Sequence, residues 1–249
     1  MRLKFWGTRG SIPAPGKDTV RYGGNTPCVE VRLSNNNLVI FDAGTGIRAL
    51  GDKLIASGES VRAYLVISHP HWDHIQGFPF FKPAFISGNE FTIVGPQSRH
   101  VTLRQMMAHL MDKAYFPIQL HKLKANIKFM PMREESAKVF DAVLTSCFVN
   151  HPLLALGYRL DAAGRSLVYI SDNEPFDREV ATSVKNVDST IVRKYSKSKA
   201  DPNQHIIDFV KGADIFIHDA TYTPEEYVNH VGWGHSHYLF CLKIAHEAG

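Results

Sequence analysis

The residues best suited to chemistry lie in one short run, Ser68-His-Pro-His-Trp-Asp-His74, directly after an apolar, β-branched stretch. It holds three imidazoles and one carboxylate, from His69, His71, Asp73 and His74. Imidazole and carboxylate suit a borderline cation such as zinc, and the carboxylate can also orient or deprotonate a water beside the cation. A histidine-rich surface loop is the alternative, but this spacing with an aspartate is more constrained than such a loop requires. The run therefore predicts a metal site.

More ligands are expected from other strand ends, because one turn cannot close a catalytic metal site. His151 follows an apolar run and precedes Pro152, and Asp172 directly follows the apolar run 167–171. Each has an ordinary alternative, since a strand-end histidine can simply be hydrogen-bonded and Ser-Asp-Asn is a common turn or helix cap. Their order after the first cluster favours ligands. Asp42 is predicted to orient ligands, with capping of the next helix as its alternative.

Apolar periodicity predicts the elements that position these residues, as a layered α/β chain. The predicted strands are 2–6, 28–33, 38–41, 61–68, 91–94, 127–130, 139–149, 157–160, 166–170 and 214–217. The predicted helices are 47–56, 98–112, 202–210 and 236–248. Strands followed by helices, twice over, predict two sheets packed face to face with helices outside, in one domain over residues 1–249. The polar segment 173–200 is predicted to be a lid or a loop excursion.

The run His69-Pro-His-Trp-Asp-His74 resembles the HxHxDH signature of the metallo-β-lactamase superfamily, and the order of His151 and Asp172 resembles its later ligand motifs. The resemblance implies a four-layer αβ/βα sandwich with the site at the edge of the sheets. It also implies two divalent cations, zinc first, with manganese or iron as alternatives. One cation would be held by His69, His71, His151 and Asp172, and the other by Asp73, His74 and Asp172.

The flanking motifs resemble one branch of that superfamily, which holds the tRNA 3′-end processing endonuclease and the cyclic phosphate phosphodiesterases. They are the opening Phe5–Pro13 with Arg21–Thr26, then His218-Asp-Ala-Thr-Tyr222 and Gly234-His-Ser236. His237 stands where the branch usually has threonine. The resemblance places His235 at the phosphate or the leaving oxygen. Independently, imidazole near neutral pH can protonate a leaving alkoxide, although His235 could instead be a neighbour of a helix N-cap without chemistry.

The sequence thus predicts a metal-dependent phosphodiesterase that uses a metal-activated water, with Asp73 and His235 as its catalytic residues. A lactone, thioester or β-lactam hydrolase and a non-catalytic metal-binding module remain the alternatives. A small phosphodiester or nucleotide-like substrate is favoured over RNA, because no long Gly- and Lys-rich arm is present to grip tRNA.

Composition adds little about partners, because 28 basic and 24 acidic residues among 249 give a net charge of only +4. No apolar stretch reaches the length of a membrane helix, and the first residues do not resemble a signal peptide. Cys28, Cys147 and Cys241 are too scattered for a disulfide framework. The expectation is a cytoplasmic protein that does not enter membranes.

The end of the sequence carries one more expectation. The superfamily's last histidine ligand lies at the end of a strand after the helix that follows Gly-His-Ser, and this sequence reaches Gly249 at the end of that helix. A fold lacking its last strand is therefore expected, with the second cation weakly held or absent. An unpaired sheet edge would also invite pairing with a second copy, so a homodimer is expected. His237 and His246 are the substitutes considered for the missing ligand.

Overall fold

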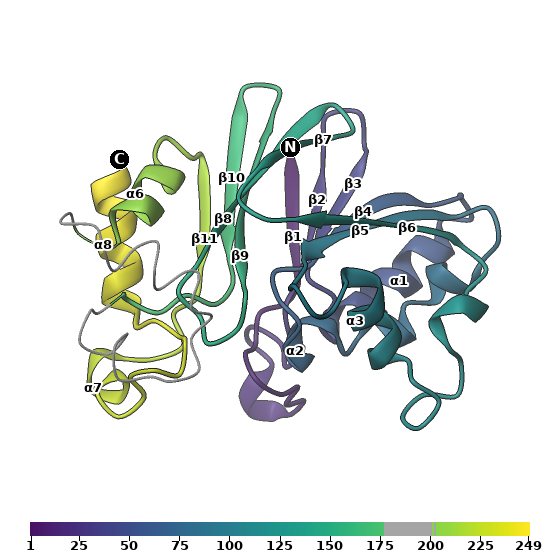
Figure 1. Ribbon diagram of the computed structural model, residues 1–249, viewed down its shortest axis with the longest axis horizontal. Helices are drawn as coiled ribbons and strands as arrows, with labels where there is room; N and C mark the ends of the chain where they lie inside the picture. The colour runs from purple at the N-terminus through teal and green to yellow at the C-terminus, as the bar shows by residue number, and fades with distance from the viewer. Residues whose placement is uncertain (177–200, 202) are drawn as a thin grey trace. The chain divides into compact units, whose positions relative to one another are not determined.

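The computed structural model describes residues 1–176, 201 and 203–249, in two compact units, Met1–Met132 and Arg133–Gly249 (Figure 1). Each unit contains one sheet and its own helices. One domain over the whole chain stays a prediction. Most of the polar segment 173–200 lies outside the described residues. Within them, no helix is long and apolar enough to cross a bilayer.

The sheet of the first unit runs in the order of the chain, from β1 to β6. β1, β2 and β3 are antiparallel neighbours, whereas β3, β4, β5 and β6 run parallel. Because parallel strands end at the same edge of a sheet, the residues that follow β3 and β4 lie close together. These are Asp42 and the run that begins at Ser68. The strands are β1 Arg2–Gly7, β2 Cys28–Arg32, β3 Leu38–Phe41, β4 Arg62–Val66, β5 Glu90–Pro96 and β6 Asn126–Met132.

The helices of this unit are α1 Gly46–Ala56, α2 Trp72–Ile75 and α3 Leu103–Leu110. α1 buries Ile47, Leu50 and Leu54 in the same core as the sheet, at the spacing of one helical face. The predicted helix 98–112 was wrong at its start. The Ser98 hydroxyl instead accepts hydrogen bonds from the backbone N–H groups of His100 and Val101. Thr102 begins α3 with a capping box.

The sheet of the second unit has the order β11-β10-β9-β8-β7. Its strands are β7 Ser136–Val139, β8 Ala142–Phe148, β9 Leu156–Ala162, β10 Arg165–Ile170 and β11 Ile215–His218. The predicted strand 139–149 was wrong in its first residues, because a turn with Phe140 at φ 55° separates β7 from β8. β10 and β11 are the parallel pair, so Asp172 and Asp219 follow neighbouring strand ends.

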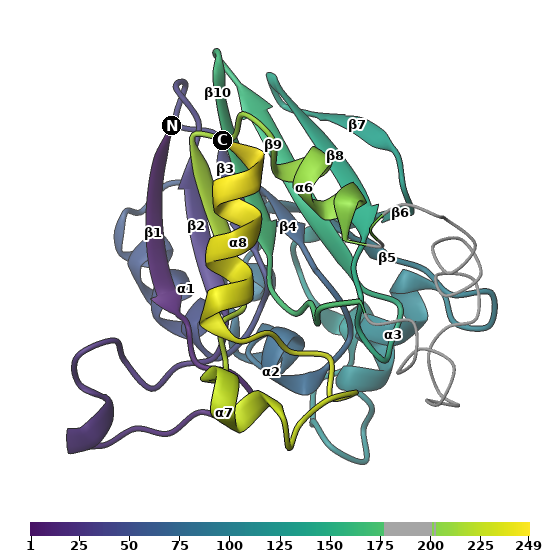
Figure 2. The ribbon, with the colours of Figure 1, turned by 90° about the vertical axis from the view of Figure 1, so that its left-hand side faces the viewer.

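Three helices complete the described part of this unit: α6 Gln204–Val210, α7 Pro224–Tyr227 and α8 Tyr238–Ala248. α6 and α8 lie side by side over one face of the sheet (Figure 2). Ile207 of α6 and Ile244 of α8 share a buried cluster with Val168 and Ile170 of β10. This packing fixes the end of β10, and with it the backbone that carries Asp172.

Candidate metal centre

The three histidines of the run Ser68–His74 converge just after the end of β4. His69 and His74 are almost fully buried, and their ring centroids lie 4.3 Å apart. Nε2 of His69 lies 3.0 Å from Nδ1 of His71, which stands at the start of α2. Buried imidazoles with facing ring nitrogens form a donor set that suits a divalent cation. The structure therefore brings together the histidines of the predicted run.

The side chain of Asp42 hydrogen-bonds two residues of this run, Ser68 and His74. Its backbone is left-handed, at φ 58°, and its carboxylate is fully buried. One oxygen accepts from the backbone N–H of Ser68 at 2.8 Å, and the other accepts from the Ser68 hydroxyl and from Nδ1 of His74 at 2.7 Å. With its proton on Nδ1, His74 presents Nε2 as a ligand atom. The structure thus shows Asp42 hydrogen-bonded to a candidate ligand, and its orienting role stays a prediction. The capping alternative is wrong, because Thr45 occupies the N-cap of α1.

Asp73 is buried on the same short helix, and one of its oxygens lies 3.4 Å from Nε2 of His74. The backbone N–H of Ser11 donates to this carboxylate oxygen at 2.8 Å. Ser11 has a left-handed backbone, at φ 66°. Sequence reasoning missed this contact, because Ser11 acts through its backbone N–H. The motif Phe5–Pro13 was the available signal.

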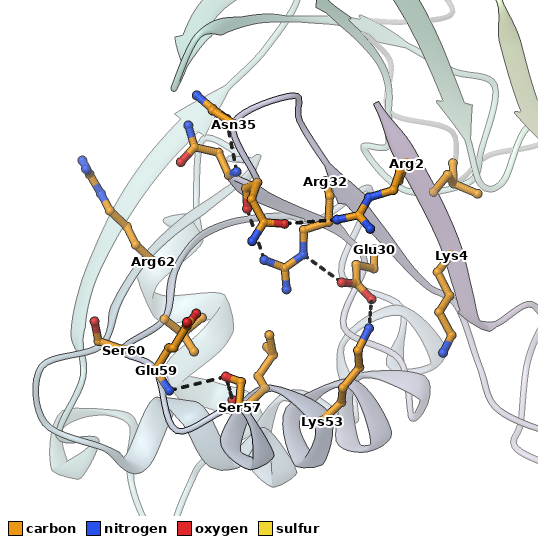
Figure 3. Close-up of a pocket in the computed structure, with 15 residues that line it drawn as sticks. Arg2, Lys4, Glu30, Arg32, Asn35, Lys53, Ser57, Glu59, Ser60 and Arg62 are labelled. Atoms are coloured by element: carbon orange, nitrogen blue, oxygen red, sulfur yellow. Dashed lines mark hydrogen bonds and ion pairs between the residues drawn. The ribbon is translucent and has the colours of Figure 1, made fainter.

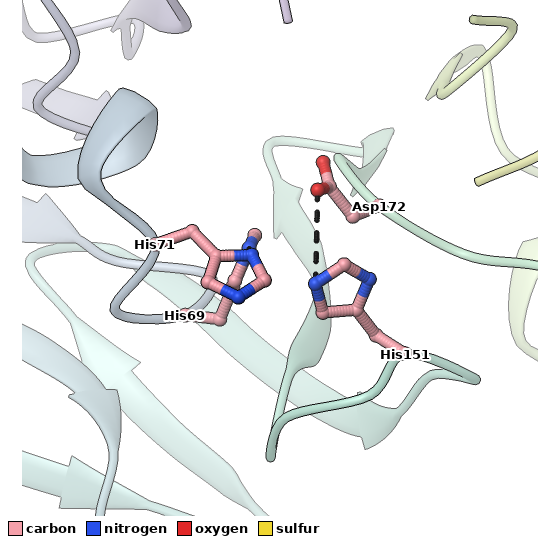
Figure 4. A group of neighbouring side chains, drawn as sticks. All are labelled: His69, His71, His151 and Asp172. Atoms are coloured by element: carbon pink, nitrogen blue, oxygen red, sulfur yellow. Dashed lines mark hydrogen bonds and ion pairs between the residues drawn. The ribbon is translucent and has the colours of Figure 1, made fainter. Parts of the chain in front are cut away.

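The second unit contributes His151 and Asp172. Nδ1 of His151 donates to the carbonyl of Gly234 at 2.9 Å, which leaves Nε2 as the ligand atom of this buried ring. Nε2 in turn lies 3.9 Å from a carboxylate oxygen of Asp172, as the dashed line in Figure 4 marks. A ring held through Nδ1 beside a carboxylate is the arrangement that a metal-ligating histidine requires, so these residues fit a cation.

His235 belongs to the same end of the second unit. Its Nδ1 donates to Asp219 at 3.0 Å and lies 3.8 Å from Asp172. The buried Asp219 carboxylate also accepts from Thr221 and from the backbone N–H of Ser236. A carboxylate at Nδ1 orients the ring and stabilises its cationic form, which a general acid needs. Sequence reasoning missed Asp219, although it lies in the motif His218–Tyr222.

Glu174 is a second residue that sequence reasoning missed. Its buried carboxylate accepts from the Tyr227 hydroxyl at 2.9 Å and from the backbone N–H groups of Gly232 and Gly234 at 2.6 and 2.8 Å. Glu174 thereby holds the loop whose carbonyl orients His151. No sequence signal beyond its position two residues after Asp172 pointed to this role.

His218, the last residue of β11, is partly buried. Burial lowers its pKa, against the opposing effects of Asp219 and Asp172, so the ring is neutral near pH 7. Its Nδ1 donates to the carbonyl of Asp219, and its Nε2 accepts from the Asn173 amide at 3.2 Å.

His237 and His246, which the sequence offered as substitutes for the missing ligand, lie at the two ends of α8. Nδ1 of His237 accepts from the backbone N–H of Phe240 at 3.3 Å, so His237 caps α8 as a threonine hydroxyl would. His246 is exposed in the last turn of that helix. Among the described residues, the candidate ligands are thus His69 and His71 in the first unit and His151 and Asp172 in the second.

Comparisons with known proteins bear on the family and the fold of this chain. The chain matches the β-lactamase superfamily domain over residues 37–199. It is 24% identical over 276 residues to ribonuclease Z of Myxococcus xanthus, covering 100% of this chain and 84% of the relative.

Two solved structures have the same fold. The metallo-β-lactamase fold protein YhfI from Bacillus subtilis is 17% identical, with a TM-score of 0.67 over 99% of this chain and 82% of that one. The short form of human tRNase Z is 18% identical, with a TM-score of 0.64 over 99% of this chain and 88% of that one.

These likenesses confirm the predicted αβ/βα sandwich class and the predicted resemblance. Relatives named ribonuclease Z match this chain along its whole length, as expected of the tRNA-processing branch. The chain belongs to the metallo-β-lactamase superfamily.

Proposed function

We propose that this metal-dependent hydrolase cleaves phosphodiesters, with His69, His71, His151 and Asp172 binding one divalent cation and Asp73, His74 and Asp172 binding a second. The buried rings of His69 and His151, whose Nδ1 atoms hydrogen-bond the Ser68 hydroxyl and the Gly234 carbonyl, support the first set. The short distance between Asp73 and His74 supports the second. Zinc is the first candidate, with manganese and iron as alternatives, because imidazole and carboxylate accept all three.

A divalent cation held by these residues would supply positive charge to neutralise the phosphate oxygens and to make a water more acidic. Asp73 then orients the attacking water and accepts its proton, while the N–H of Ser11 keeps that carboxylate in place. His235, as the imidazolium, gives its Nε2 proton to the departing oxygen. Asp219 holds Nδ1 and balances the charge of the ring during this step.

The observation that carries this proposal is the pair His235 and Asp219. A phosphodiester with an alkoxide leaving group needs a proton donor, and an imidazole oriented by a buried carboxylate is such a donor. Nδ1 of His235 lies 3.8 Å from a carboxylate oxygen of Asp172, which supports an acid beside a proposed metal ligand. This pair favours phosphodiester chemistry over the hydrolysis of a lactone or thioester.

The choice of substrate within this class is a further proposal. A small phosphodiester or nucleotide-like molecule is the first candidate, from the absence of a long basic arm in the sequence. RNA is the second, and the full-length likeness to a protein named ribonuclease Z favours it. Cleavage of an RNA with a 3′ trailer, compared with cleavage of bis(p-nitrophenyl) phosphate, separates the two.

The test combines metal content with activity. Purified protein is expected to hold at least one equivalent of a transition metal and to hydrolyse bis(p-nitrophenyl) phosphate when supplied with zinc, manganese or iron. His71→Ala should lose most of the metal and the activity. His121→Ala, which removes an exposed histidine, is the matched control. Full metal retention by His71→Ala would show the ligand assignment to be wrong. Bound metal without phosphodiesterase activity would leave the metal-binding module as the function.

A further inference from the structure

A basic cavity lies in the first unit, away from the histidines. Its volume is about 590 Å³, within the range of small-ligand sites. The charged residues that line it are the cations Arg2, Lys4, Arg32, Lys53 and Arg62 and the carboxylates Glu30 and Glu59 (Figure 3). Positive charge therefore exceeds negative charge in the lining of this basic cavity.

The strand directions separate this cavity from the candidate metal centre. β3 and β4 are parallel, and the metal-binding run and Asp42 follow their C-terminal ends. The cavity instead contains Arg62, the first residue of β4, and Asn37, which precedes β3. Within the first unit, the two features thus lie at opposite edges of the same sheet.

The buried carboxylate of Glu30 organises the cavity. It accepts from Nε of Arg32 at 2.8 Å and from Nε1 of Trp6 at 2.9 Å, and Nζ of Lys53 lies 3.7 Å away. Glu30 is thus already neutralised by its own partners, and it fixes the positions of two cations. It does not compete with a ligand for the remaining cations.

The turn between β2 and β3 fixes the arginines further. Asn36, with a left-handed φ of 64°, accepts from Nη1 of Arg32 through its carbonyl and from Nη2 of Arg2 through its side chain. Lys4 lies over the ring of Trp6, 3.9 Å from the centroid. Cations held in place by a turn, an aromatic ring and a buried carboxylate lose little freedom when an anion binds.

We propose that this basic cavity is a second anion site, which binds a phosphate group. Guanidinium forks match phosphate oxygens in geometry, and the asparagine amides at the rim add hydrogen-bond donors. The phosphate can belong to a free nucleotide or to an RNA strand, and the experiment separates these sources.

The test measures binding of adenosine 5′-monophosphate and of a single-stranded ten-nucleotide oligoadenylate by calorimetry at low salt. The variant Arg2→Gln/Arg62→Gln removes two exposed cations without touching Glu30. It should bind about tenfold more weakly than the wild type. Lys122→Gln/Lys124→Gln removes the same charge from exposed positions outside the cavity and should bind like the wild type. Circular dichroism checks that each variant is folded, and Arg62→Glu alone serves as the second cavity variant.

Binding of the mononucleotide would identify a nucleotide site, and binding of the oligomer alone would identify a contact with RNA. Binding of neither probe overturns the proposal. Equal weakening in the cavity and control variants also overturns it, because this would be a general charge effect. Hydrolysis of bis(p-nitrophenyl) phosphate, measured on the same preparations, should remain at the wild-type rate in both double variants. A failure of the proposed function is thereby distinguished from a failure of the second site.

Discussion

The carbonyl of Gly234 accepts a hydrogen bond from Nδ1 of His151 at 2.9 Å, although 83 residues separate the two in the chain. The backbone of Gly234 is left-handed, at φ +85°. A Cβ atom there would overlap both the His151 ring and Pro152. Glycine is therefore required for the backbone angle and for the space, and both requirements serve the orientation of a metal ligand.

Gly234→Ala should consequently displace the His151 ring and lower metal content and turnover together. Gly212→Ala is the matched control, because Gly212 is also left-handed, at φ +66°, and a Cβ there has nothing within 4 Å. Each variant should lose about 1–2 kcal/mol of stability from the backbone angle alone. Metal analysis and turnover of both variants test this. Equal behaviour of the two would mean that the contact with His151 is not functional.

Glu174 extends the same argument to the loop around Gly234. Glu174→Gln replaces a carboxylate that accepts three hydrogen bonds by an amide whose NH₂ group would face one of the donors. We expect about a tenfold fall in turnover and a measurable loss of stability. Tyr227→Phe removes one of the donors and leaves both glycine N–H groups paired, so its turnover should stay near that of the wild type. If Tyr227→Phe is as impaired as Glu174→Gln, the two glycine contacts do not carry the effect.

The candidate ligands could be proposed from the sequence because their chemistry is local. The run from His69 to His74 concentrates its donors in one turn, and His151 and Asp172 each follow an apolar strand that periodicity reveals. The hairpin of β2 and β3 was likewise predictable from the polar turn between two apolar runs. In each case a short stretch of sequence contains the whole signal.

The residues that support the site could not be predicted in the same way. Ser11 reaches Asp73 over 62 residues through a backbone N–H, which every residue except proline has. Glu174 acts through backbone groups 58 and 60 residues away. Such contacts depend on where loops fold, and residue type gives no signal for them. The start of α3 was missed for a related reason, because Ser98 and Thr102 are both good caps and tertiary packing chooses between them.

The role of His235 can be tested through the leaving group. His235→Ala should lower turnover by ~10²-fold or more for phosphodiesters with poor leaving groups, since these need a proton. The loss should be much smaller with p-nitrophenolate, which leaves without one. Metal content should stay near that of the wild type. Asp219→Asn should show the same dependence on the leaving group to a smaller degree, because it disturbs the orientation of the ring but keeps the imidazole. Equal losses on both kinds of substrate would show that His235 is structural.

Glu30 links the basic cavity to the stability of the first unit at acid pH. Burial acts to raise its pKa, but the hydrogen bonds from Arg32 and Trp6 and the charges of Lys53 and Arg32 outweigh this effect, so its pKa lies below the ordinary 4.5. A carboxyl whose pKa is lowered by folding stabilises the protein above its unfolded-state pKa, and this stability is lost as the pH falls through the folded-state pKa. Glu30→Gln should therefore cost about 2 kcal/mol near neutral pH, and the difference from the wild type should shrink below about pH 4. Urea unfolding measures the free energy of unfolding at neutral and at acid pH.

Glu59→Gln is the control, because it removes an exposed carboxylate of the same cavity. It should not change the free energy of unfolding by more than about 0.5 kcal/mol at either pH. A Glu30→Gln difference that is constant with pH would mean that packing, and not the charge on the carboxylate, is what Glu30 contributes.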